Sequence, residues 1–305
     1  MSRLSRYGED RLNTLWFHLG AFLTVSAWGV SFVSTKVLLE NGLNPVEIYV
    51  YRFLLAYLLL LMFNHRRLFA NNLRDEVLFA ACGLCGGSIY FIAENTALEY
   101  TLVSNVSLIT TLAPLITTLG IGALYRSERP TRGVVMGSMI AFVGVGFVIF
   151  NSSFVVKMNP LGDLLALLAA VCFAVYSIVL RKLNALYSVM FISRKTFFYG
   201  IVTALPFLAF EPDMSDPRVL LRPEVMGNML FLGLFASMIA YAIWAQSIKR
   251  LGAVRASNYL YVQPIVTLIA SFFILNENIS LVGYIGCALI LVGLWVSDRF
   301  SGNRA

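Results

Sequence analysis

Residues 107–146, SLITTLAPLITTLGIGALYRSERPTRGVVMGSMIAFVGVG, return in altered form at residues 257–295, SNYLYVQPIVTLIASFFILNENISLVGYIGCALILVGLW. Each copy is an apolar segment that contains a proline, Pro114 or Pro264, followed by a short turn with a glutamate and then a glycine-rich apolar segment. A sequence that repeats itself at half its length is most simply a duplication. The chain is therefore predicted to consist of two equivalent halves.

The composition places the chain in a membrane. Of its 305 residues, 59% are hydrophobic and only 13% are charged, whereas a soluble domain has about 25% charged residues. Such a chain cannot cover a globule with polar surface, so it must face membrane lipids. The net charge of +7 does not indicate nucleic-acid binding, because the basic residues lie in short loops between apolar runs and do not form one basic surface.

The apolar runs predict the number of membrane spans. A helix that crosses a bilayer needs about 20 apolar residues. The first run is too long for the apolar core of a signal peptide, and we interpret it as the first span. The ten predicted spans cover residues 16–39, 46–63, 76–98, 102–124, 132–150, 161–183, 188–210, 225–248, 253–275 and 279–298.

The charges of equivalent turns predict how the halves are oriented. The turn RSERPTR at residues 126–132 carries three arginines, whereas its equivalent NENIS at residues 276–280 carries none. Arginine and lysine concentrate on the cytoplasmic side of membrane proteins, so the two turns are predicted on opposite sides. Five spans in each half require the same inversion, and duplicated, inverted halves are typical of transporters.

The predicted fold class is therefore an all-α polytopic membrane protein, with ten transmembrane helices in two inverted five-helix repeats around a central cavity. The repeats are residues 16–150 and 161–298. The tails, residues 1–15 and 299–305, are predicted in the cytoplasm. The protein is predicted to be a multi-pass protein of the cytoplasmic (inner) membrane.

Two motifs carry a resemblance to a known family. The first is AWGVSFVSTKVLLENGLNPVEIYVYRFLLA at residues 27–56, with Trp-Gly in the first span, a proline, and Arg-Phe in the second; the other is the pair of segments with Pro114 and Pro264. With the ten spans and the duplication, the chain resembles the EamA-type ten-helix members of the drug/metabolite transporter superfamily over residues 16–297. The resemblance implies a central cavity between the halves, alternating access for small organic solutes and, in many members, export of amino acids or metabolites. The second half departs from it at Phe173-Ala174, where Trp-Gly would stand, and lacks a clean proline spacing before Arg194.

Two charged residues inside predicted spans are candidates for the transport pathway. A charge at the centre of a span costs about 2.5–3.5 kcal/mol on insertion scales, so it usually faces a cavity or a partner. We hypothesise that Arg52 and Glu94 pair or together line the outer part of the pathway. The alternative for Arg52 is that its side chain extends to the interface or binds a loop carbonyl. Glu94 is also the candidate site for a proton as coupling ion, the alternative being a structural or interfacial acid.

Prolines and aromatic residues complete the predicted solute site. A proline inside a helix frees a carbonyl and bends the axis, which membrane helices tolerate beside a cavity. Aromatic residues deep inside spans favour a solute with an apolar or aromatic body and a polar head, although helix packing is the alternative for each. The predicted substrate-binding residues are Trp28, Ser31, Arg52, Tyr90, Glu94, Thr110, Pro114, Tyr176, Tyr241, Trp244, Tyr259, Gln263 and Pro264.

Glycines recur at heptad spacing in the fifth and tenth spans, Gly137 with Gly144 and Gly286 with Gly293. Small residues let helices approach closely. We interpret these two spans as scaffold, and as a candidate face for a homodimer.

The sequence offers no support for an enzyme, a metal or a cofactor. His18 and His65 are far apart, and the pair Cys82 and Cys85 has no accompanying histidine or second cysteine pair. No glycine-rich phosphate loop appears, so ATP is not the predicted energy source. The predicted function is secondary transport of a small organic solute, amino acid-like or drug-like, in the direction of export. The alternatives are a membrane channel and a membrane-embedded lipid-modifying enzyme.

Overall fold

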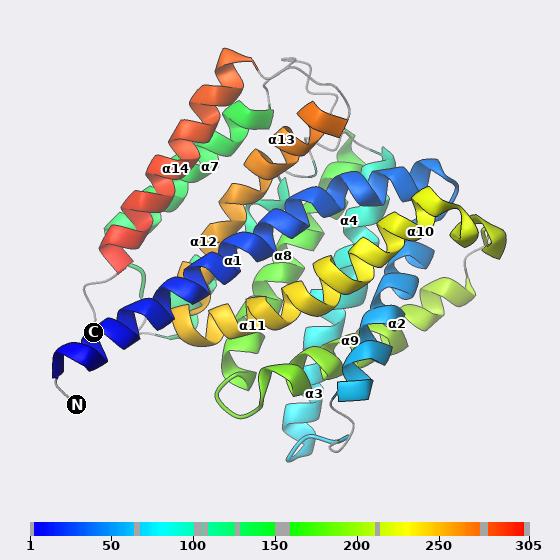
Figure 1. Cartoon of the computed structure of the whole chain (residues 1–305), viewed down its shortest axis with the longest axis horizontal. Coiled ribbons are helices and arrows are strands. Elements are labelled where there is room, and N and C mark those ends of the chain that lie inside the picture. Colours follow the sequence, from blue (N-terminus) through cyan, green and yellow to red (C-terminus); the bar gives the residue numbers. More distant parts are fainter. Residues whose placement is uncertain are drawn as a thin grey trace.

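The computed structural model describes residues 3–63, 68–100, 106, 109–125, 129–149, 159–210, 214–274 and 280–301, which form helices joined by turns, with no strand among them (Figure 1). The chain has the predicted fold class of ten helical segments in two repeats. The turns that contain Glu128 and Glu277 lie outside the described residues, so their predicted positions are left to experiment.

Each predicted span of the first half has a helical counterpart. The first and second spans are single helices, the third is divided by a π-helical segment, and the fourth is described mainly from its second part. The elements are α1 (Arg3–Glu40), α2 (Pro45–Phe63), α3 (Leu73–Gly83), η1 (Leu84–Ser88), α4 (Ile89–Tyr100), α6 (Ala113–Leu124) and α7 (Arg132–Ile149).

The second half repeats this order, including the divided third and fourth helices. Its elements are α8 (Pro160–Leu183), α9 (Val189–Ala209), η3 (Pro217–Leu221), α10 (Pro223–Leu230), η4 (Phe231–Ile239), α11 (Ala240–Leu251), α12 (Ala253–Asn258), η5 (Tyr259–Val262), α13 (Gln263–Ile274) and α14 (Leu281–Ser301). Gly252, with φ +85°, makes the one-residue turn between α11 and α12, a conformation that a residue with a β-carbon rarely adopts.

The third helix of each half contains a π-helical segment, η1 in the first and η4 in the second. Inside η1 the backbone of Gly87 leaves the helical region, with φ −134° and ψ −106°. A π-helical segment interrupts the regular hydrogen-bond ladder and often marks a functional site. The two segments therefore put irregular backbone at equivalent places in the two halves.

The prolines of the repeated motif do not lie inside continuous helices, contrary to the prediction. Pro114 is the second residue of α6, which follows a turn at residues 111–112, and Pro264 is the second residue of α13, which follows the 3₁₀ turn η5. The reason is that proline lacks an N–H and clashes with the preceding turn, whereas it is well tolerated at the start of a helix. The fourth helix of each half is thus broken just before its proline.

The helices pack in symmetry-related pairs. Helix α1 packs against α11 and α13 of the second half, and α8 packs against α4 and α6 of the first. The second helices, α2 and α9, contact each other, and each also packs on the third helix of the opposite half. Every one of these contacts joins the two halves, so neither half is an independent core.

The fifth helices, α7 and α14, form a glycine-mediated pair at one side of the bundle (Figure 1). A β-carbon on Gly137 would lie 2.6 Å from the carbonyl oxygen of Gly293, and one on Gly144 would lie 2.8 Å from that of Gly286. Gly137, early in α7, faces Gly293, late in α14, whereas Gly144, later in α7, faces Gly286, earlier in α14. The two equivalent helices are therefore antiparallel, as inverted repeats require. These glycines face each other inside one chain, which accounts for their spacing; a homodimer formed by the outer faces of these two helices stays a prediction.

The outer surface of the bundle is apolar. Along α8, the side chains at helical spacing Leu161, Leu164, Leu168, Val171 and Val175 are all exposed. Among the residues that the structure describes, five helical segments are long and apolar enough to cross a membrane, and shorter apolar helices accompany them. The five are Leu15–Glu40, Pro45–Met62, Leu73–Tyr100, Pro160–Leu183 and Pro223–Leu251. A chain with this surface is an integral membrane protein.

Candidate functional site

An aromatic cluster fills the centre of the bundle, where α1, α8 and α11 meet. The ring of Trp28 lies 5.1 Å from Trp244, 5.6 Å from Phe173 and 5.8 Å from Tyr241, measured between centroids. All four side chains are buried. Phe173 is the residue that stands at the place of Trp28 in the second half, so the cluster joins equivalent positions of the two repeats.

Tyr241 links this cluster to the second helices. Its ring packs against Phe53 of α2, Phe197 of α9 and Tyr176 of α8, with centroids 5.7, 5.2 and 5.8 Å away. Tyr90 joins through Phe173, at 5.4 Å. Five predicted aromatic residues, Trp28, Tyr90, Tyr176, Tyr241 and Trp244, therefore come together.

The π-helical segments provide acceptors for this cluster. The indole N–H of Trp28 donates to the carbonyl of Ala236 in η4, at 2.8 Å, and the hydroxyl of Tyr241 donates to the carbonyl of Gly86 in η1, at 2.5 Å. Irregular helical backbone leaves carbonyls without their usual partners. In each half, a carbonyl of the π-helical segment thus accepts a hydrogen bond from an aromatic side chain of the other half.

Arg52 is buried beside the aromatic cluster, with 1% of its surface exposed. Its Nε donates to the hydroxyl of Ser237 in η4, at 2.9 Å, and its guanidinium carbon lies 4.5 Å from the ring centroid of Phe91. Its Nη2 is buried and has no hydrogen-bond partner. The alternative that Arg52 extends to the interface is therefore wrong: the guanidinium lies inside the bundle, between helices of both halves.

Glu94 lies near Arg52 but does not form an ion pair with it. The two side chains interact electrostatically, yet no pair within 4.0 Å joins them among the described residues. Glu94 Oε1 accepts a hydrogen bond from the hydroxyl of Tyr90 at 2.6 Å, and the residue is 7% exposed. A carboxylate has about four acceptor positions, so the hydrogen bond from Tyr90 leaves acceptor capacity on a carboxylate that interacts electrostatically with Arg52.

Three predicted site residues make hydrogen bonds outside the aromatic cluster. The hydroxyl of Ser31 donates to the carbonyl of Trp28 and that of Thr110 to Val106, each within its own helix. The hydroxyl of Tyr259 lies 2.6 Å from Nδ1 of His18. Tyr259 begins the 3₁₀ turn η5, which interrupts the α-helical period before Gln263.

Three more predicted residues, Pro114, Gln263 and Pro264, lie at the helix breaks. All three are buried, and α13 begins at Gln263. The carbonyl oxygen of Gln263 would lie 2.9 Å from a β-carbon on Gly29, so this break packs directly on α1. These residues shape the contact between the first and fourth helices of opposite halves.

Sequence reasoning missed several members of the site. Phe173 contacts Trp28, Ser237 and Phe91 contact Arg52, and Tyr49 interacts electrostatically with Arg52. A local signal existed only for Tyr49, since it shares one helical face with Arg52 and Phe53. The others lie on different helices, so no spacing in the sequence reveals them.

The model of the EamA-like transporter family matches residues 15–150 and 160–297. An uncharacterized transporter of Archaeoglobus fulgidus is 29% identical over 91% of this chain and 96% of its own, and a second from the same organism is 27% identical over 92% and 96%.

A further relative, a probable terminal-alkyne amino-acid exporter of Streptantibioticus cattleyicolor, is 26% identical over 92% of this chain and 93% of its own. A solved crystal structure of a protein with 20% sequence identity matches with a TM-score of 0.74, over 92% of this chain and 98% of that one. At this identity the structural match shows a shared fold. The names of the relatives indicate transporters, which are not enzymes.

Proposed function

The chain belongs to the EamA-like transporter family, and from this premise we propose that it exports a small zwitterionic organic solute across the cytoplasmic membrane by alternating access. The observation that carries the proposal is the buried guanidinium of Arg52, whose Nη2 lacks a partner. It lies between the two halves and near the carboxylate of Glu94. An unsatisfied buried donor beside a carboxylate with spare acceptor capacity suits a solute that brings both charges.

Arg52 is suited to the anionic group of the solute. A guanidinium has five N–H donors in a planar fork that matches a carboxylate, and it is not deprotonated in proteins. The Nε of Arg52 donates to the hydroxyl of Ser237, and the face of the guanidinium lies over the ring of Phe91. The Nη2 end remains for a carboxylate oxygen, and the charge of the solute would offset the cost of burying the guanidinium, which is several kcal/mol for an unpaired ion.

Glu94 is suited to the cationic group. Its Oε1 is held by the hydroxyl of Tyr90, which fixes the carboxylate near the aromatic rings of Phe173 and Phe91. Rings of this kind also attract an ammonium group through their negative faces. Glu94 is the candidate for the coupling proton as well, because a proton and an ammonium group that compete for one carboxylate would couple their movements.

The body of the solute would lie against the aromatic cluster. In this conformation the rings pack on one another and are buried, so a solute would enter as the halves separate and the rings move apart. An apolar or aromatic side chain would replace ring–ring contacts that the opening breaks. The name of the Streptantibioticus relative, a probable amino-acid exporter, supports both the zwitterionic head and the direction.

The test is a thermal-stability series with matched ligands and detergent-solubilised protein. The probes are L-phenylalanine, its methyl ester, which lacks the carboxylate, and 3-phenylpropionate, which lacks the ammonium group. A ligand that binds only the folded state stabilises it by about 2.7 kcal/mol at one hundred times its Kd. We expect the amino acid to raise the melting temperature and each truncated probe to do so less.

Variants assign the two ends of the ligand. Arg52→Lys should remove the preference for the amino acid over the ester, because lysine keeps the charge but not the planar fork. Glu94→Gln should remove the preference over 3-phenylpropionate. The matched control is Arg250→Gln, whose guanidinium lies over Phe17 and should leave both preferences intact.

Coupling is tested separately, with protein in vesicles. Solute uptake driven by an imposed proton gradient should exceed uptake without one, and Glu94→Gln should remove the difference. Equal rates in the unmodified protein would end the proton hypothesis but not the proposal for the solute. A melting temperature that responds equally to all three probes would contradict the zwitterion proposal.

A further inference from the structure

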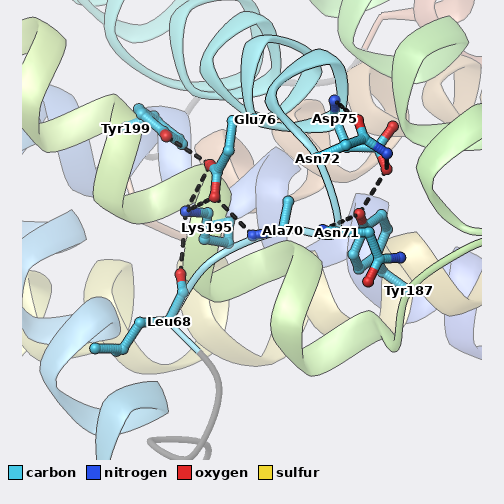
Figure 2. A network of polar contacts seen from close by, with 9 residues as sticks. All are labelled: Leu68, Ala70, Asn71, Asn72, Asp75, Glu76, Tyr187, Lys195 and Tyr199. Atoms are coloured by element: carbon cyan, nitrogen blue, oxygen red, sulfur yellow. Dashed lines mark hydrogen bonds and ion pairs between the residues drawn. The ribbon is translucent and has the colours of Figure 1, made fainter.

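At one end of the bundle, a polar network ties the two halves together (Figure 2). Lys195 of α9 places its Nζ 2.7 Å from Oε2 of Glu76 in α3 and donates to the carbonyl of Leu68 at 3.2 Å. The hydroxyl of Tyr199 donates to Glu76 Oε2 at 2.6 Å, and the backbone N–H of Ala70 to Oε1 at 2.7 Å. We call these five residues the lysine clasp.

A neighbouring contact strengthens the same connection. The hydroxyl of Tyr187, in the turn before α9, donates to Oδ2 of Asp75 at 2.6 Å and accepts from the backbone N–H of Asn71 at 2.8 Å (Figure 2). The loop before α3 is thus bound to the start of α9 at two places. The loop belongs to the first half and α9 to the second.

A second cross-half contact involves the start of α2. The carboxylate of Glu47, fully buried, accepts from the hydroxyl of Ser215, at 2.8 Å to each oxygen, and from its backbone N–H at 3.1 Å. Glu47 also forms a reciprocal capping pair with Asn44 at the start of the helix. We call Glu47 and Ser215 the serine clasp.

The two clasps are related by the repeat. In each, a charged residue on the second helix of one half holds the loop before the third helix of the other half. They lie at opposite ends of α2, since Glu47 is in its first turn and Leu68 follows its end at Phe63. At 1.5 Å per residue, about 24 Å of helix separates Glu47 from Phe63.

We propose that the two clasps are the two gates of the protein, and that they open in alternation. The proposal rests on alternating access as proposed above. Two inverted halves that rock about a central site must separate at one end while they stay joined at the other. The clasps are polar contacts between the halves at the two ends, so breaking either one releases that end alone.

The two clasps differ in strength, and this difference determines which end of the protein opens more readily when no solute is bound. The lysine clasp contains an ion pair, with side chains 5% and 15% exposed, supported by three further hydrogen bonds. The serine clasp has a single charge. In an ion pair, the attraction between two opposite charges adds to the hydrogen bonds. The end with the serine clasp should therefore open more readily in the absence of solute.

The experiment measures from which side the centre of the protein can be labelled. Cys85, a half-buried residue of η1, serves as the reporter in a variant with Cys82, Cys172 and Cys287 replaced by alanine. An impermeant maleimide is applied to inside-out and right-side-out vesicles. Lys195→Met should increase the labelling rate severalfold from the side of the lysine clasp, predicted to be cytoplasmic. Ser215→Ala should increase it from the other side.

Milder variants and a control keep the test informative. Glu76→Gln and Glu47→Gln keep hydrogen-bonding groups but remove the charge, so they should shift labelling in the same directions if Lys195→Met or Ser215→Ala does not fold. Lys182→Met, on the last turn of α8, should leave labelling from both sides unchanged.

The outcomes separate gates from ordinary stabilising contacts. Opposite shifts for the two clasps support the proposal. Unchanged labelling, or an equal rise from both sides, would overturn it, since loss of a purely structural contact loosens the fold without choosing a side. Sided labelling together with a failed ligand series would keep the gates and remove only the proposed solute.

Discussion

The hydroxyl of Tyr241 donates a hydrogen bond to the backbone carbonyl of Gly86, across the boundary between the two halves. The carbonyl belongs to η1 and the tyrosine to α11, which are parts of the third helices of opposite halves. The contact therefore links the irregular backbone of one repeat to the aromatic cluster that both repeats build. It explains why a π-helical segment can exist at the buried centre.

Tyr241→Phe tests this link. The substitution removes the donor and leaves the Gly86 carbonyl buried and unsatisfied, so we expect the free energy of unfolding to fall by about 1–3 kcal/mol. The measurement is thermal or denaturant unfolding of purified protein. Tyr284→Phe, at a side chain 61% exposed, is the control, and its effect should stay within about 0.5 kcal/mol. An equal fall in the free energy of unfolding in the two variants would show that the hydrogen bond to Gly86 does not stabilise the fold.

The glycine contact between α7 and α14 gives a second prediction. A β-carbon on Gly137 would lie 2.5 Å from the backbone nitrogen of Ser297, whereas one on Gly146 would meet nothing within 4 Å. Gly137→Ala should therefore destabilise the protein by about 1–3 kcal/mol through overpacking. Gly146→Ala should be neutral or stabilising by up to about 1 kcal/mol, because alanine favours the helix. Unfolding measurements on both variants decide; a destabilised Gly146→Ala with an unaffected Gly137→Ala would contradict the packing.

The ion pair of the lysine clasp gives a third prediction. Lys195 is buried and Glu76 is partly buried, so removing either partner leaves a poorly compensated charge, and Lys195→Met and Glu76→Gln should each destabilise by about 1–3 kcal/mol. The double variant should lose less than the sum, because neither charge is left behind. The difference should be about 0.5–3 kcal/mol, measured by unfolding of all four proteins. Additive losses would mean that the two side chains act independently.

Much of the architecture could be predicted from the sequence because its signals are local. The apolar run lengths, the repeated proline motif and the opposite charges of two turns each depend on neighbouring residues, and they predicted ten helices in two inverted repeats. The helix breaks before Pro114 and Pro264 were expected as bends inside helices, since spacing alone does not say where a helix restarts.

The contacts of the site depend on tertiary packing, and here prediction reached only part of the answer. Trp28 and Trp244 could be proposed from their depth in the spans, but Phe173 and Ser237 become partners only when helices of opposite halves meet. The spacing of the glycines in the fifth helix of each half indicated a close helix pair, but it did not say whether the two helices belong to one chain or to two. Tyr259, at the start of the 3₁₀ turn η5, lies against His18, a contact that no spacing in the sequence indicates.

The most direct test of the central claim, two inverted halves around one shared site, is the side of the membrane on which two equivalent turns lie. In a variant without native cysteines, Arg129→Cys and Ser280→Cys are each labelled with an impermeant maleimide in sealed vesicles of known orientation. The account predicts that position 129 reacts from the cytoplasmic side and position 280 from the opposite side. Labelling of both positions from the same side would contradict it.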